Sequence, residues 1–386
     1  MHLSTGFSDL SWKPVMTART NTLEYWLNWR FLVCAIEVFS SMLIATILIW
    51  KYEGFNAGEE GEEAQEEAAG TLYDDESWRP CLKEIHPAWL LAFRVTAFLV
   101  LTALLIINIA VQGGEMFYFY TQWTFTLVAT YFGVGSLLSI YGCQKFRSKV
   151  DSNMLSQMRL ETEQGTYVVP TSAESTNTAD RMKTYGSQEE YYMRPVGGFW
   201  GYAFQIIYQT NAGAVVLTDC VFWLIIVPFL TMRDYSLNFV STLANLTMES
   251  QDASDPFPLI FLSFEYFLLK RILICIVRQF MIGMHSVNAV FLLGDTALNS
   301  LRFPWYRISY FVLWTGVYVI FQWVIHACIP IWWPYPFLDM SSSYAPIWYL
   351  SVAVMHIPCY AIFMVITKLK HLLLSRCFPQ SYVCLR

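Results

Sequence analysis

The chain has 386 residues, of which 55% are hydrophobic and 14% charged, whereas a soluble domain usually carries about 25% charged residues. Its net charge of -6 comes mainly from one acidic loop, and no basic surface stands out that would favour nucleic acid as a partner. The 15 Trp, 23 Tyr and 28 Phe suit the interfacial belts of a membrane protein. We therefore predict an all-α, polytopic transmembrane bundle.

Motifs of soluble enzymes are missing from the sequence. The nine cysteines are scattered, with no C-x-x-C pair and no zinc-ligand spacing. There is no phosphate-binding loop, nucleotide fingerprint, serine elbow or HExxH helix. We expect no metal and no cofactor.

Long apolar stretches recur along the chain and are the candidate membrane spans. A helix needs about 20 apolar residues to cross a hydrocarbon core of about 30 Å. Six stretches meet that length readily, at residues 31–50, 88–111, 117–141, 204–230, 308–329 and 345–367. A seventh, at about 280–299, is shorter and more polar because it holds His285, Asn288 and Asp295. The sequence thus predicts about seven spans.

The loops divide the chain further and indicate its orientation. We distinguish an N-terminal segment (1–28), a first span (29–50), an acidic flexible loop (51–87) and the second and third spans (88–141). A flexible polar loop (142–198), the fourth to seventh spans (199–371) and a tail (372–386) follow. Most Lys and Arg fall in the loops that are internal if the N-terminus is outside. The positive-inside rule therefore favours seven spans with the N-terminus outside, although basic residues in the N-terminal segment argue mildly against it.

One segment, 240–279, complicates this count. It begins polar and turns apolar over 258–277, where Glu265, Lys270 and Arg271 lie. A lone span with such charges is costly, so we interpret the segment as an interfacial or extracytoplasmic insertion. If it does cross the membrane, everything downstream is inverted.

Thr121 and His285 are the residues that could carry chemistry. An imidazole in an apolar segment is costly to bury and titrates near neutral pH, which suits a general base. In the predicted topology both residues lie about 6–8 Å below the outer boundary of the membrane, so they could meet as a nucleophile and its base. The structural alternative is that the threonine bonds back to a carbonyl of its own helix, and that His285 bonds a neighbour such as Asn288.

Other polar and aromatic residues are candidates for lining the same pocket, namely Thr124, Asn288, His326, Trp333 and Tyr335. Asp219 is a candidate orienter of the imidazole, but pairing with another polar group of the bundle is the favoured interpretation. Asp295 lies about 15 Å along the helix from His285, too far to bond it. Arg94 is expected to snorkel towards the membrane surface, and His356 to be structural or to line the cavity.

Three short motifs resemble the androgen-induced-gene family, which includes the androgen-dependent tissue-factor-pathway-inhibitor regulator and is related to the rolling stone proteins. Residues 120–133 resemble its threonine helix, and Gly283-Met284-His285 is similar to its histidine motif. Residues 333–339 are similar to its late W-x-Y-P-F-L-[DE] signature. The resemblance covers roughly residues 115–370, and the segments 78–81 and 86–89 look like those of plant-type members.

The resemblance implies an intramembrane hydrolase that cleaves fatty acid esters of hydroxy fatty acids, with Thr121 as nucleophile and His285 as base. Its expected partners are membrane lipids and a fatty ester substrate, in an endomembrane or the plasma membrane. Three features depart from the family. The Asn-His pair that precedes its Met-His is replaced by Arg278-Gln279-Phe280, segment 240–279 has no counterpart, and the first span and acidic loop extend beyond the animal enzymes.

The alternative is a non-catalytic membrane protein of the adhesion, signalling or scaffolding type. In that case the loops 51–87 and 142–198 would bind protein partners. A transporter is less favoured, because the sequence shows no inverted repeat and no matching pair of broken helices.

Overall fold

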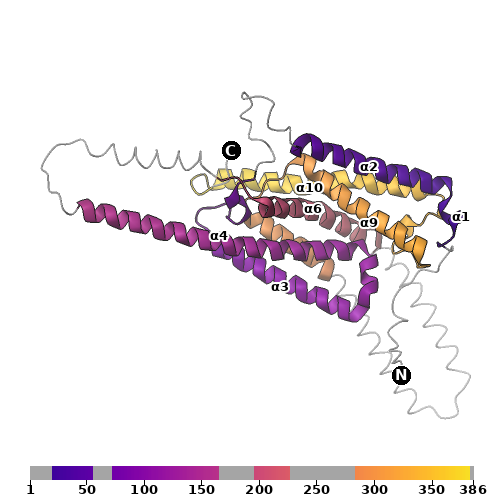
Figure 1. Cartoon of the computed structure of the whole chain (residues 1–386), viewed down its shortest axis with the longest axis horizontal. Helices are drawn as coiled ribbons and strands as arrows, with labels where there is room; N and C mark the ends of the chain where they lie inside the picture. Colours follow the sequence, from indigo (N-terminus) through magenta and orange to yellow (C-terminus); the bar gives the residue numbers. More distant parts are fainter. Residues whose placement is uncertain (1–19, 55–71, 165–194, 227–282, 383–386) are drawn as a thin grey trace, which may run out of the picture.

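The computed structural model describes residues 20–54, 72–164, 195–226 and 283–382. They form a helical bundle (Figure 1) whose long helices are α2 (Trp29–Glu53), α3 (Pro87–Gln112), α4 (Tyr120–Gln164), α6 (Phe199–Val221), α9 (Ile308–Cys328) and α10 (Ala345–Cys377). A further helix runs over residues 283–298. Short helical turns connect them, at α1 (Leu23–Trp26), η1 (Asp74–Ser77), η2 (Gly113–Tyr118), η3 (Phe222–Ile226), η4 (Trp305–Arg307) and η5 (Pro336–Leu338).

Within the described parts of the chain, five helical stretches are long and apolar enough to cross a membrane, at Trp29–Glu53, Pro87–Ala110, Tyr120–Ser152, Trp305–Cys328 and Ala345–Cys377. Their outward faces are apolar, as on α2, where Leu32, Ile36 and Leu43 are all well exposed. Such a surface is typical of contact with lipid tails rather than water. The prediction of an all-α, multi-pass membrane protein is confirmed, while the number of seven spans stays a prediction.

Helix α6 lies at the centre of the bundle, where it packs on α4, α9 and α10. It carries buried polar residues, among them Gln205, Gln209 and Asn211. These residues are tolerated because neighbouring helices, and not lipid, surround them. Gln205 Oε1 accepts a hydrogen bond of 2.5 Å from the buried guanidinium of Arg307, whose Nε also pairs with Glu53 at the end of α2.

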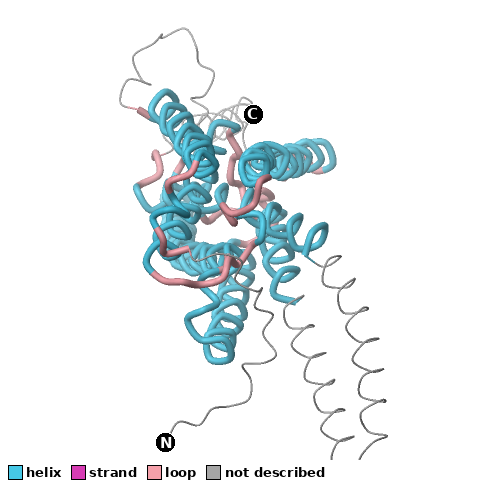
Figure 2. The backbone as a smooth tube through the Cα atoms, turned by 90° about the vertical axis from the view of Figure 1, so that its right-hand side faces the viewer, coloured by secondary structure: helices cyan, strands magenta, loops and turns pink. Residues whose placement is uncertain are grey.

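The bundle has two distinct ends, seen from the side in Figure 1 and along its length in Figure 2. We call the end formed by α1, η2 and residues 329–344 the aromatic end, because rings such as Tyr25, Trp333 and Tyr335 are buried there. We call the opposite end, formed by residues 72–86 and 299–307, the charged end, because ion pairs such as Arg302–Glu76 lie there.

Residues 72–86 differ from the prediction of one flexible loop over 51–87. Trp78 and Cys81 are buried, and Tyr73 and Pro80 form isolated β-bridges to Val196 and Asn299. The apolar side chains of this part give it a surface to bury, which composition averaged over the whole loop conceals. The acid-rich part of the predicted loop, like the insertion at 240–279, lies outside the described residues.

Helix α4 also differs from the prediction, which began a flexible loop at residue 142. It continues to Gln164 and projects well beyond the bundle (Figure 1). After Gly142 this stretch contains no Gly or Pro and is rich in Lys, Arg, Gln, Glu, Leu and Met, all good helix formers. Polarity alone therefore did not mark the end of the helix.

Close packing of α6 against α9 depends on Gly213. A Cβ at this position would lie 2.4 Å from the ring of Phe311, so Gly213→Ala is expected to lower the free energy of unfolding by about 1–3 kcal/mol. The measurement is the melting temperature of the purified protein in detergent. Gly114→Ala is the control, because nothing lies within 4 Å of a Cβ there. Equal melting temperatures for the two variants would contradict the prediction.

Candidate active site

The relative positions of Thr121 and His285 follow from how α4 is aligned with the helix over 283–298. The hydroxyl of Tyr131 donates a hydrogen bond of 2.5 Å to Asp295 Oδ2, which ties the two helices together. Counting ten residues back from each of these anchors leads to Thr121 and His285. Because the helices run in the same direction, the two residues lie at one level, about 15 Å from the anchors towards the aromatic end.

Helix α6 brings a third polar residue to this level. It runs antiparallel to the helix over 283–298, and Tyr208 Oη lies 3.0 Å from Thr296 Oγ1. Eleven residues along α6 from Tyr208 is Asp219, and eleven residues before Thr296 is His285. The two registers are therefore mutually consistent.

His285 is buried against α6, next to the carboxylate of Asp219 in that helix. Its Nδ1 is 3.9 Å from Asp219 Oδ1, within ion-pair range though longer than a hydrogen bond. The imidazole also stacks on Phe222, with ring centroids 3.8 Å apart. The Asp219 side chain is 23% exposed, so this pair is accessible from one side. Asp219 is thus the carboxylate that lies beside His285, the neighbour that the sequence offered as a candidate orienter.

Thr121 lies in the first turn of α4, half-buried. Its hydroxyl and its backbone amide both interact with the hydroxyl of Tyr335, in the loop before α10. A first-turn amide has no carbonyl partner in its own helix, and here the hydroxyl oxygen of Tyr335 accepts from it instead. Burial raises the pKa of Tyr335 to about 12, so its hydroxyl keeps its proton at neutral pH. Among the hydrogen bonds of the described residues there is none between Thr121 and His285.

The remaining predicted pocket residues have structural contacts. Thr124 is buried and donates to the carbonyl of Tyr120 in its own helix, at 3.2 Å. His326 stacks on Trp333 with ring centroids 3.7 Å apart, and its Nδ1 lies 2.7 Å from the carbonyl of Gln322. These contacts are those of the structural alternative.

Asn288, one turn along the helix from His285, does not bond it. Its side chain is buried, and its Oδ1 has no hydrogen-bond partner among the described residues. A buried amide oxygen without a partner is costly and is commonly satisfied by water or a ligand. Gln122 Oε1 and Asn211 Oδ1 are in the same condition. The described part of the bundle interior therefore offers several buried acceptors without a hydrogen-bond partner.

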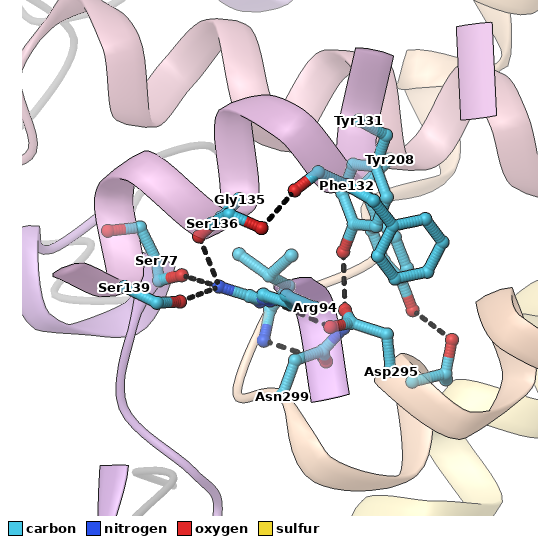
Figure 3. A network of polar contacts seen from close by, with 12 residues as sticks. Ser77, Arg94, Tyr131, Phe132, Gly135, Ser136, Ser139, Tyr208, Asp295 and Asn299 are labelled. Carbon is cyan, nitrogen blue, oxygen red and sulfur yellow. Dashed lines mark hydrogen bonds and ion pairs between the residues drawn. The ribbon is translucent and has the colours of Figure 1, made fainter. Parts of the chain in front are cut away.

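The prediction that Arg94 snorkels to the membrane surface is wrong. Its side chain is fully buried, and its Nε donates to Asp295 Oδ1 at 2.7 Å. Its Nη1 donates to the carbonyl of Ser77 and to Ser139 Oγ (Figure 3), at 2.7 and 2.8 Å. Sequence alone did not reveal this, because Asp295 is 201 positions away. The network lies at the charged end, away from His285.

The fold and the site define a multi-pass helical membrane protein with a hydroxyl, an imidazole and a carboxylate at one level of its bundle. The chain matches no family model, no curated protein and no solved structure. Its resemblance to the androgen-induced-gene family therefore rests on the three motifs alone.

Proposed function

We propose that the protein is an intramembrane lipid ester hydrolase of the androgen-induced-gene type, in which Thr121 is the nucleophile and His285 the base. The observation that carries the proposal is the contact of 3.9 Å between His285 Nδ1 and Asp219. If Nδ1 carries the ring proton on the side of this carboxylate, Nε2 is the nitrogen left to accept a proton. The shared level of Thr121 supports the pairing.

The reaction follows the scheme of a nucleophile, a base and an orienting acid. The hydroxyl oxygen of Thr121 attacks the carbonyl carbon of the ester while its proton passes to His285 Nε2. The leaving alcohol takes that proton, and water then hydrolyses the acyl-threonine. Asp219 stabilises the imidazolium that forms between these steps. Because Thr121 and His285 are not hydrogen-bonded in the structure, catalysis requires the two side chains to approach each other.

The proposed substrate is a fatty acid ester of a hydroxy fatty acid. The class comes from the motif resemblance, and the position of the site supports it. Thr121 and His285 lie among helices whose outward faces are apolar, so a substrate dissolved in the bilayer can reach the protein without entering water.

The test uses purified protein and a branched fatty ester. Thr121→Val and His285→Gln are each expected to reduce the turnover that this pair catalyses by about 10³-fold or more, because each removes a reacting group. Thr130→Val is the matched control, since Thr130 is exposed on the same helix and bonds only back to the Thr126 carbonyl. Wild-type turnover in both site variants would refute the proposal.

A non-catalytic role in adhesion, signalling or scaffolding is the second candidate, favoured by one observation. Helix α4 extends to Gln164, far beyond the bundle, as a partner-binding element would. Removing residues 153–194 would then abolish capture of the partner, while Thr121→Val would leave capture unchanged. Retained capture after the deletion would exclude this role for the loop.

A further inference from the structure

A second hydroxyl–imidazole pair lies in the bundle interior, between α9 and α10. Thr315 Oγ1 of α9 is 2.8 Å from His356 Nε2 of α10, and 2.9 Å from Tyr120 Oη of α4. All three side chains are buried. This pair, unlike Thr121 and His285, is hydrogen-bonded in the structure.

The direction of each hydrogen bond follows from its partners. His356 Nδ1 lies 2.8 Å from the carbonyl oxygen of Val352, which can only accept, so Nδ1 carries the ring proton. In a neutral imidazole Nε2 is then an acceptor, and Thr315 must donate to it. The oxygen of Thr315 in turn accepts from the hydroxyl of Tyr120. The chain of donors therefore runs from Tyr120 through Thr315 to His356.

One contact competes with this arrangement. Thr315 Oγ1 also lies 3.2 Å from the carbonyl of Phe311, one turn earlier in α9. A hydroxyl has a single proton, and the 2.8 Å contact with His356 is the shorter of the two. Donation to Phe311 would also leave the buried Nε2 without a donor, which is costly. The proton of Thr315 is therefore assigned to the bond with His356.

The surroundings of His356 keep it neutral and so able to act as a base. The ring of Phe311 packs against the imidazole, with centroids 4.3 Å apart. The contacts of His356 among the described residues are this ring, a carbonyl and a hydroxyl, and none is a carboxylate. An uncharged imidazole with a free lone pair is the state that accepts a proton from a nucleophile.

The pair adjoins the site of the proposed function. Tyr120 directly precedes Thr121 in the chain. On the other side, Cys359 lies one turn from His356 and interacts with Cys220, which directly follows Asp219. The two hydroxyl–imidazole pairs are thus linked through neighbouring residues, Tyr120 beside Thr121 and Cys220 beside Asp219.

We propose that Thr315 and His356 form a second nucleophile–base pair for carboxylic esters, with Tyr120 polarising the hydroxyl. The substrate class rests on the proposed function. Thr315 Oγ1 bonds to the ester carbonyl carbon as its proton moves to His356 Nε2, and the ester C–O bond breaks as the alcohol leaves with that proton. Water, deprotonated by His356, then cleaves the acyl-threonine, which releases the fatty acid and restores the threonine.

The test is covalent labelling of the full-length protein with a long-chain alkyl fluorophosphonate. The nucleophilic hydroxyl forms an O–P bond, fluoride leaves, and peptide mass spectrometry locates the modified residue. We expect the label on Thr315, its loss in Thr315→Val and in His356→Gln, and its retention in Thr315→Ser, which keeps the hydroxyl. Labelling of Thr121 without Thr315 would overturn this inference and leave the proposed function intact.

The remaining outcomes also discriminate. A label on Thr315 alone would support the inference and refute the assignment of Thr121, whereas no label on either residue would refute both. Thr210→Val is the folding control, because Thr210 is buried and bonds only back to the carbonyl of Ile206, at 2.9 Å. If Thr315→Val matches Thr210→Val in melting temperature yet loses the label, the loss reflects chemistry. If Thr315→Val lowers the melting temperature and Thr315 takes no label in the wild type, the hydrogen bond between Thr315 and His356 is purely structural.

Discussion

Arg94→Met is expected to lower the free energy of unfolding by about 3–5 kcal/mol. The substitution leaves the carboxylate of Asp295 in the bundle interior without the guanidinium that pairs with it at 2.7 Å. Hydrogen bonds from Tyr131 and Asn299 to Oδ2 remain, but they do not neutralise the charge. The measurement is denaturant-induced unfolding of the purified protein in mixed micelles.

The double variant Arg94→Met/Asp295→Leu is expected to recover most of this loss, because it removes both buried charges together. Arg79→Met is the matched control. The Arg79 side chain is 38% exposed and pairs with Asp75 at 3.4 Å, and such surface pairs are worth about 0–1 kcal/mol. If Arg94→Met unfolded with the same free energy as Arg79→Met, the ion pair would not be a stabilising feature of the bundle.

Asp219→Asn is expected to reduce kcat for ester hydrolysis by about 10²–10⁴-fold, provided that the proposed function holds. The amide preserves the shape of the side chain but removes the charge that orients His285 and stabilises its protonated form. The measurement is kcat and KM for a branched fatty ester, with KM expected to stay close to that of the wild type. Asp219 touches the base rather than the substrate, so it is a positioning residue.

The pH profile separates this role from a structural one. Removing a carboxylate beside an imidazole destabilises the protonated imidazole, so the lower limb of the profile should move to lower pH in Asp219→Asn. Asp75→Asn at the charged end serves as the control and should leave the profile in place. A melting temperature that falls while kcat and the pH profile stay unchanged would show that Asp219 supports the fold alone.

The class of fold could be predicted because hydrophobic length is a local property of the sequence. The stretches 31–50 and 308–329 correspond closely to α2 (Trp29–Glu53) and α9 (Ile308–Cys328). The end of α4 could not be predicted in this way, because residues 142–164 are polar and helical at the same time. Arg94 was misplaced for another reason, since its partner comes from a distant part of the chain.

The candidate site was only partly readable from the sequence. Counting residues from the ends of two apolar stretches gave Thr121 and His285 a common depth, and the register of the helices gives them one level. The stretch 204–230 put Asp219 near mid-span, and helical structure does continue past it, from α6 into η3 (Phe222–Ile226), where this described part ends. Thr315 and His356 belong to none of the three motifs, and only the packing of α9 on α10 brings them together.

The length of α4 determines how far from the bilayer its tip can act. The part from Lys145 to Gln164 rises by about 28 Å, close to the diameter of a small domain. The helix therefore extends as a spacer from the charged end, where Lys145 pairs with Asp74. A soluble protein bound at the tip would sit clear of the lipid headgroups, whereas one that recognised Arg79 or Lys145 would have to fit between the helix and the membrane surface.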